Sequence, residues 1–166
     1  MHLSEDAPAR AAPRDPAALP GVAPRPAETW LRIVQVHDRI TRRVDSALHR
    51  QHGLSLTGFE ALRRIADAPG ERASMGEVAE ALGLSRPGVT STVGRLVADG
   101  LVVRERGDAD RRLLHATLTP AGRQRVTEAA RTHDELVAHL LALLGDDAAV
   151  VTDALARVSA AARSRH

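Results

Sequence analysis

Two groups of polar and basic residues in this 166-residue chain have the types and spacing that suit contact with a polyanion. The first lies on a helix predicted over residues 85–99, whose outward face carries hydroxyls, arginines and a proline: Ser85, Arg86, Pro87, Thr90, Ser91 and Arg95. The other face is apolar and is predicted to point inward: Val89, Val93, Leu96 and Val97. An α-helix fits the major groove of B-DNA, and a face of short polar groups without carboxylates can approach bases and phosphates there. The amides at its N-terminus, with Ser85, could also meet a phosphate.

The second group gathers four arginines on a predicted β-hairpin: Arg104, Arg106, Arg111 and Arg112. Residues 101–106 and 113–118 are rich in Val, Leu and Thr and flank a polar turn, which is typical of a hairpin. A thin hairpin tipped with arginine can enter the minor groove, where narrow A·T-rich segments have an enhanced negative potential. Asp108 and Asp110 could pair with these arginines and fix their geometry. The alternative is a surface hairpin whose charges neutralise one another.

Helical periodicity and capping signals predict the elements that would position these two groups. Capping boxes open two short helices, at Thr57 with Glu60 and at Ser74 with Glu77, and Thr119-Pro120 opens a long one. The predicted helices cover about residues 28–53, 57–68, 74–83, 85–100 and 119–144, with a last helix after residue 147. The sequence therefore predicts a mainly α fold with a small β-hairpin wing, which is a winged helix-turn-helix domain with added N- and C-terminal helices.

The composition excludes several classes of protein. Cysteine is absent, so disulfides, thiolate zinc sites and a cysteine nucleophile are excluded. The apolar runs are too short to span a bilayer and there is no secretory signal, so no membrane partner and a cytoplasmic protein are expected. The net charge is only +2, and all 23 basic residues are arginine, so any nucleic-acid argument depends on where they lie. Six of the nine prolines fall within residues 1–26, which predicts a disordered tail.

The wing sequence and its neighbours resemble the MarR (multiple antibiotic resistance regulator) family of transcriptional regulators. Residues 110–119 (Asp-Arg-Arg-Leu-Leu-His-Ala-Thr-Leu-Thr) fit the family pattern Asp-x-Arg-x5-Leu-Thr, followed by Pro120-Ala121-Gly122. Supporting matches are Leu56-Thr57, Leu82-Gly83-Leu84-Ser85 and Asp99-Gly100-Leu101-Val102. A departure is Thr90-Ser91-Thr92 in the middle of the recognition helix, where many members have an arginine.

The resemblance implies a bacterial, double-stranded DNA-binding homodimer, commonly a repressor released by a small aromatic or anionic effector. Its domains would be a tail over 1–26, a dimerisation helix over 27–53, a winged domain over 54–119 and dimerisation helices over 120–166. Arg112 would reach the minor groove, with Asp110 as its positioning partner. A two-fold dimer predicts a pseudo-palindromic operator with half-sites about one helical turn apart.

Candidate residues for an effector pocket lie on the first three helices: Trp30, His37, Phe59, Arg63 and Met75. Packing in the core is the alternative for each. A urate-responsive branch of the family also has a tryptophan on its first helix. The charged residues that bind the ligand in that branch are not matched in this sequence, which has Glu60, Asp67 and Thr92 near those positions.

Neither metal nor enzyme chemistry has a matching pattern. The histidines at positions 49, 52, 133 and 139 form no dense cluster with carboxylates, so no metal and no cofactor are predicted. There is no glycine-rich phosphate loop or nucleophile elbow, so the chain is not expected to be an enzyme. The alternative function is a winged-helix protein-interaction module without sequence-specific DNA binding.

Overall fold

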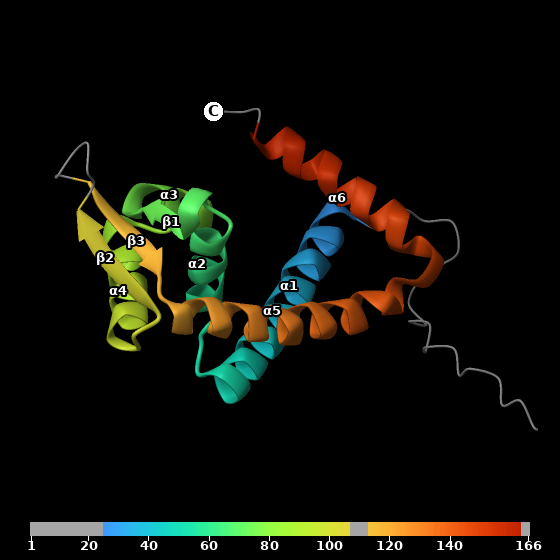
Figure 1. Cartoon of the computed structure of the whole chain (residues 1–166). Coiled ribbons are helices and arrows are strands. Elements are labelled where there is room, and N and C mark those ends of the chain that lie inside the picture. Colours follow the sequence, from blue (N-terminus) through green and yellow to red (C-terminus); the bar gives the residue numbers. More distant parts are fainter. Residues whose placement is uncertain (1–24, 107–112, 164–166) are drawn as a thin grey trace, which may run out of the picture. The chain divides into compact units, whose positions relative to one another are not determined.

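The computed structural model describes residues 25–106 and 113–163, and the mainly α fold predicted from the sequence is confirmed (Figure 1). The chain divides into two compact units, residues 1–35 and 36–166. The elements in chain order are α1 (Pro26–His52), α2 (Leu56–Ala66), η1 (Pro69–Glu71), β1 (Arg72–Ser74), α3 (Met75–Leu82), α4 (Arg86–Ala98), β2 (Val102–Arg106), β3 (Leu114–Leu118), α5 (Pro120–Leu141), η2 (Ala142–Asp147) and α6 (Ala148–Arg163). No described helix is both long and apolar enough to cross a membrane.

The core of the second unit lies where α2, α3, α4 and the sheet meet. Its largest fully buried side chains come from five elements: Phe59, Leu48, Leu62, Ile65, Val78, Val93 and Val102. The same cluster extends to Val126 and Ala129 of α5, which ties the long helix to the winged domain. Each such side chain contributes about 1.5–3 kcal/mol when it leaves water, so this cluster holds α4 and the hairpin in place.

The sheet has three strands in the order β1-β3-β2, all antiparallel. The hairpin of β2 and β3 was predicted and is confirmed, with Val102 opposite Leu118 and Arg106 opposite Leu114. Strand β1 was not predicted. It is only three residues long and forms by pairing with β3, where Ala73 lies opposite the buried Ala116.

Two of the three helix starts expected from caps are confirmed. The Ser74 hydroxyl accepts a hydrogen bond from the Glu77 amide, and the Glu77 carboxylate accepts one from the Ser74 amide at 2.7 Å, so the capping box at α3 is complete. Thr119 caps α5 by accepting from the amide of Gly122 at 3.0 Å. The start predicted at Thr57 is wrong, because Ser55 caps α2 by accepting from the amide of Gly58.

The helix predicted to run from Thr119 to about Leu144 ends earlier. Helix α5 stops at Leu141 and continues as the 3-10 segment η2, in which Gly145 has a φ of 51° and a ψ of −131°. L-residues with side chains rarely adopt that conformation, so the glycine makes the break between α5 and α6 possible. At the other end, Pro26 belongs to α1 and not to the preceding segment, because proline suits the first turn of a helix. Residues 1–24 of the predicted tail lie outside the described residues.

Candidate nucleic-acid interface

Helices α3 and α4 are joined by a tight turn that depends on one glycine. Gly83 ends α3 in the left-handed region with a φ of 62°, and the Leu84 amide donates back to the carbonyl of Ala79 at 2.9 Å. Ser85 then caps α4, with its hydroxyl accepting from the Gly88 amide at 3.3 Å, and Pro87 lies in the first turn. Local sequence therefore fixes both the turn and the first residue of the helix that follows it.

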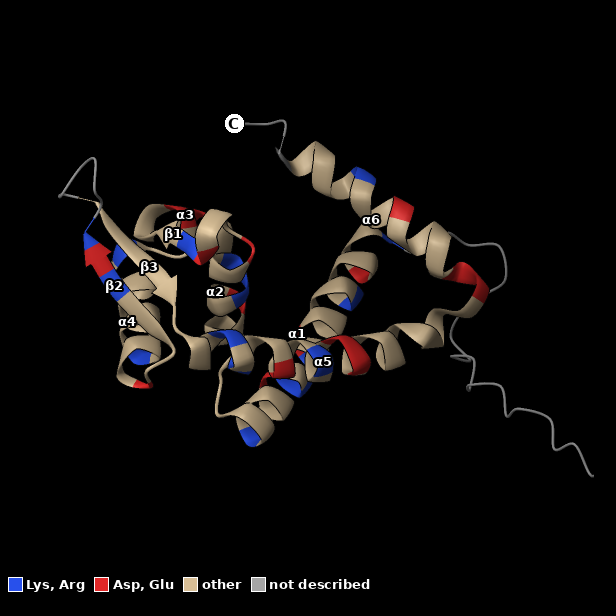
Figure 2. Cartoon of the chain, viewed as in Figure 1, with Lys and Arg blue, Asp and Glu red and all other residues tan. Residues whose placement is uncertain are grey.

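The outward face of α4 has the composition that the sequence predicted. All six residues assigned to it are exposed: Ser85, Arg86, Pro87, Thr90, Ser91 and Arg95. The helix contains no Asp or Glu, and the nearest carboxylate in sequence is Asp99 just beyond its end (Figure 2). This surface thus offers hydroxyls and two guanidinium groups with no carboxylate on the helix to repel a phosphate.

The inward face of α4 differs from the prediction at two positions. Val89, Val93 and Leu96 are buried, as predicted. Val97 is 37% exposed and so does not belong to the core, whereas Thr92 is 9% exposed and does. Helical spacing places residues 89, 92, 93 and 96 on one stripe, and position 97 falls at its edge.

The wing packs against α4 through an arginine of its first strand. The Arg104 guanidinium donates to the backbone carbonyl of Thr90 at 2.8 Å, across 14 residues of sequence. Arg106 is exposed farther along the same strand, and its carbonyl accepts from the Arg72 guanidinium at 3.3 Å. The predicted tip residues Asp110, Arg111 and Arg112 lie outside the described residues.

The base of the wing is held to α5 by a close backbone contact. The Thr119 amide donates to the Leu101 carbonyl at 3.1 Å, and the Thr119 hydroxyl donates to the Gly100 carbonyl at 2.8 Å. Gly122 packs so tightly there that an added Cβ would lie 2.0 Å from the Leu101 carbonyl oxygen. The Thr-Pro-Ala-Gly run therefore joins the wing to the helix that follows it.

One carboxylate near the helix-turn-helix has a shifted pKa. The backbone amide of Ser74, and then its hydroxyl, hold the pKa of Glu77 below its ordinary value of 4.5 by hydrogen bonding to the charged form. Glu77 is therefore ionised at neutral pH, and it lies on α3, not on α4.

The comparisons with known proteins point in one direction. Residues 52–113, which include α2, α3, α4 and β2, match the family model described as MarR family. The structure of AbsC, a MarR family transcriptional regulator from Streptomyces coelicolor, matches with a TM-score of 0.75 and 26% identity over 84% of this chain and 95% of that chain. The winged domain is therefore similar to that of MarR family transcriptional regulators.

Two further structures share the MarR fold. Sco3205 of Streptomyces coelicolor, solved in complex with DNA, is 24% identical over 81% of this chain and 85% of that chain, with a TM-score of 0.74. BpsR of Bordetella bronchiseptica, whose DNA binding is regulated by 6-hydroxynicotinic acid, is 24% identical over 82% of this chain and 93% of that chain, with a TM-score of 0.66. No curated protein matches the sequence. The MarR family comprises transcriptional regulators, which are not enzymes.

The five residues predicted to line an effector pocket have different surroundings in the structure. His37 lines a hollow of about 550 Å³ between α1 and α2: His37, Thr41, Arg42, Asp45, Leu56, Thr57 and Glu60. Phe59 is a core residue, 1% exposed, with its ring 5.1 Å from that of His133. Arg63 is exposed, Met75 packs partly buried against the core, and Trp30, 67% exposed, belongs to the first unit.

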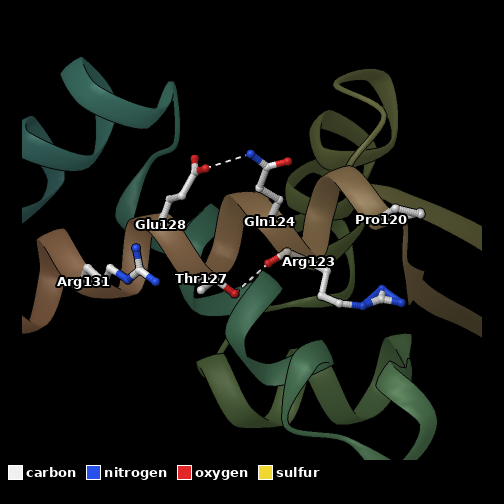
Figure 3. A pocket seen from close by; sticks show the side chains of 6 residues that line it. All are labelled: Pro120, Arg123, Gln124, Thr127, Glu128 and Arg131. Carbon is white, nitrogen blue, oxygen red and sulfur yellow. Dashed lines mark hydrogen bonds between the residues drawn. The ribbon is translucent and has the colours of Figure 1, made fainter.

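A second hollow, of about 430 Å³, follows one face of α5 and was not anticipated from the sequence (Figure 3). Four of its polar side chains make hydrogen bonds or an ion pair. Gln124 donates to Glu128 at 2.9 Å, Thr127 donates to the carbonyl of Arg123 at 2.9 Å, and the Arg123 guanidinium lies 2.9 Å from the Glu71 carboxylate. These contacts fix the surface of α5 beside η1.

Some of the histidines in the part of the chain that the structure describes make hydrogen bonds. His52 bonds to the Thr132 hydroxyl at 2.8 Å, and His133 bonds to Asp134 at 2.8 Å. Among the described residues there is no group of three or more His, Cys, Asp or Glu side chains with the geometry of a metal site.

Proposed function

We propose that the protein is a sequence-specific regulator that binds double-stranded DNA as a homodimer, with α4 in the major groove. The observation that carries the proposal is the exposed face of α4, which has hydroxyls and arginines and no carboxylate. Electrostatic attraction to phosphate supplies much of the affinity of such a helix, and short polar groups can read base edges. Sco3205, which shares the fold, was solved on DNA.

We assign the direct contacts by residue type. Ser85 and the first amides of α4 would meet a phosphate, Arg86 and Arg95 would contact phosphate or guanine, and Thr90 and Ser91 would face base edges. Pro87 would shape the first turn and contact the groove wall. Arg106 would contact a phosphate and the tip arginines Arg111 and Arg112 the minor groove, with Asp110 positioning Arg112 as the resemblance implies.

The homodimer is supported by apolar side chains that no described element covers. Nine large apolar residues of α1 and of the α5–α6 region are exposed by 39–83%: Trp30, Leu31, Ile33, Val36, Leu141, Leu143, Val150, Leu155 and Val158. Clusters of exposed large apolar side chains on helices mark interaction surfaces. A two-fold dimer would place two copies of α4 in successive major grooves, about 34–36 Å apart, on a pseudo-palindromic operator.

We further propose repression that a small aromatic or anionic effector relieves. The support is BpsR, a protein of the same fold whose DNA binding is regulated by 6-hydroxynicotinic acid. The hollow between α1 and α2 offers the polar side chains of His37, Thr41 and Arg42 to such a ligand.

A selection of bound duplexes from a random pool tests the proposal. The purified full-length protein should enrich one pseudo-palindromic sequence, because a two-fold dimer reads two equivalent half-sites. Arg112→Ala should weaken binding to the selected duplex by about 1–3 kcal/mol, the worth of a specific groove contact, without loss of the dimer. Enrichment of no sequence, together with binding that is insensitive to salt, would favour a protein-interaction module instead.

A further inference from the structure

We infer that Arg104 is a positioning residue that locks the wing to the recognition helix and thereby raises the discrimination between DNA sequences. The inference rests on the proposed function. The role of Arg104 then differs from that of Arg106, Arg111 and Arg112, with which it was grouped on sequence alone.

Strand geometry places Arg104 on the side of β2 that faces α4. Val102, two residues earlier, is buried in the core, and Arg104 lies opposite Ala116, which is also fully buried. Alternate residues of a strand share one face, so Arg104 emerges on the core side where the core ends. From there its guanidinium donates to the Thr90 carbonyl at 2.8 Å.

The surface of α4 is shaped to receive this guanidinium. A helical carbonyl keeps one lone pair after it accepts its bond from the amide four residues on, so Thr90 can accept from Arg104 without loss of helix. One turn later, a Cβ added at Gly94 would lie 3.6 Å from the same Arg104 nitrogen. Because Gly94 has no side chain, the Arg104 guanidinium can lie against the helix. A side chain longer than that of alanine at position 94 would occupy the same space.

The bond joins two surfaces that must contact DNA together. Thr90 and Ser91 are exposed on the proposed reading face, and Arg106 follows Arg104 along β2. A charged donor held on a backbone carbonyl is a strong contact, and it fixes the angle between α4 and the hairpin. Specific binding needs α4 and the wing engaged at the same time, whereas non-specific attraction to phosphates tolerates a loose wing.

The test compares Arg104→Gln with Arg106→Gln, which removes the same charge from the same face of the same strand. Each full-length variant is titrated against the duplex selected by the wild type and against a scrambled duplex, at several salt concentrations. We expect Arg104→Gln to lose about tenfold in affinity for the selected duplex, as for one charge-assisted hydrogen bond, with scrambled binding and the salt slope unchanged. We expect Arg106→Gln to weaken both duplexes and to reduce the salt slope by about one, as for a phosphate contact.

A DNA-free measurement keeps the inference separate from the proposed function. Amide hydrogen exchange in the unbound protein should be faster in β2 and around Thr90 in Arg104→Gln than in the wild type, and unchanged in Arg106→Gln. If the wild type selects no duplex, the proposed function fails, and the exchange rates still decide whether Arg104 locks the wing. If Arg104→Gln does not fold, Arg104→Lys replaces it, because it keeps the charge and loses the planar fork; its selected-duplex affinity should fall at least about threefold at an unchanged salt slope.

Two results would overturn the inference. One is a salt slope for Arg104→Gln that falls as it does for Arg106→Gln, which would make Arg104 a phosphate contact. The other is an Arg104→Gln variant that has wild-type affinity for both duplexes and wild-type exchange rates, which would show that the bond to Thr90 has no effect.

Discussion

Replacing Gly122 by alanine should destabilise the protein more than the addition of one methyl group suggests. An ideal Cβ at this position would lie 2.0 Å from the Leu101 carbonyl oxygen, and carbon–oxygen contacts settle at about 3.3 Å, so the two must separate by about 1.3 Å. The obstacle is backbone, which cannot rotate away as a side chain would. The Leu101 carbonyl also accepts the Thr119 amide, so moving it strains the junction between the wing and α5.

The expected cost follows from two terms. Overpacking a buried site costs about 1–3 kcal/mol, and weakening the hydrogen bond at Leu101 adds about 1 kcal/mol. The sum of about 2–4 kcal/mol corresponds to a decrease of roughly 4–16 °C in Tm for a chain of this length. The assay is thermal unfolding followed by circular dichroism at one fixed protein concentration, because dimer formation would make Tm depend on concentration.

Gly76→Ala provides the matched control. Gly76 is an exposed residue of α3, and the nearest atom to its added Cβ is the Ser74 hydroxyl oxygen at 3.8 Å, an ordinary contact. Alanine is the better helix former by up to about 1 kcal/mol, so this variant should unfold at the wild-type temperature or slightly above it. A Gly122→Ala protein that melts with the wild type would refute the close approach of α5 to Leu101.

Three other predictions concern the cap, the pH dependence and the dimer. Thr119→Ala should lower stability by about 1–2 kcal/mol through loss of the cap, measured by urea denaturation, whereas Thr119→Ser should retain most of it. Hydrogen bonds from Ser74 lower the pKa of Glu77, so the stabilisation by the ionised Glu77 is complete above pH 4.5 and is lost as the pH falls through the lowered pKa. The Tm measured from pH 6 to pH 3 should therefore fall less steeply in Glu77→Gln than in the wild type. Parallel curves for the two proteins would contradict the assignment. Leu143, which is 83% exposed in η2, should form part of the dimer surface, so light scattering should show Leu143→Glu shifted toward monomer, and an unchanged dimer would place the interface elsewhere.

The features that the sequence predicted correctly are those with local causes. The caps at Ser74 and Thr119 depend on contacts over three residues, and the outward face of α4 depends on helical spacing. The start of α2 was misplaced because Ser55 and Thr57 are both hydroxyl residues two positions apart. Only packing selects between them: Gly58 and Phe59 are buried, which fixes the register of the helix.

The features that the sequence missed have causes distant along the chain. Strand β1 exists because β3 offers an edge to residues 72–74, which carry no strand pattern of their own. Charge alone does not show which of the four wing arginines contact DNA. The bond from Arg104 to the Thr90 carbonyl depends on how the hairpin packs on α4, and composition cannot show it.

A fluorescence-anisotropy titration of the full-length protein at several salt concentrations tests directly whether α4 reads DNA. The probes are the DNA upstream of its own coding sequence, the duplex chosen by selection, and a scrambled duplex of equal length. We expect tight binding to a duplex that carries the pseudo-palindrome, weaker binding to the scrambled one, and an affinity that falls steeply with salt because arginines displace counterions from phosphates. Equal, weak and salt-insensitive binding to all three duplexes would contradict this expectation, because the carboxylate-free face of α4 would then have no part in reading DNA.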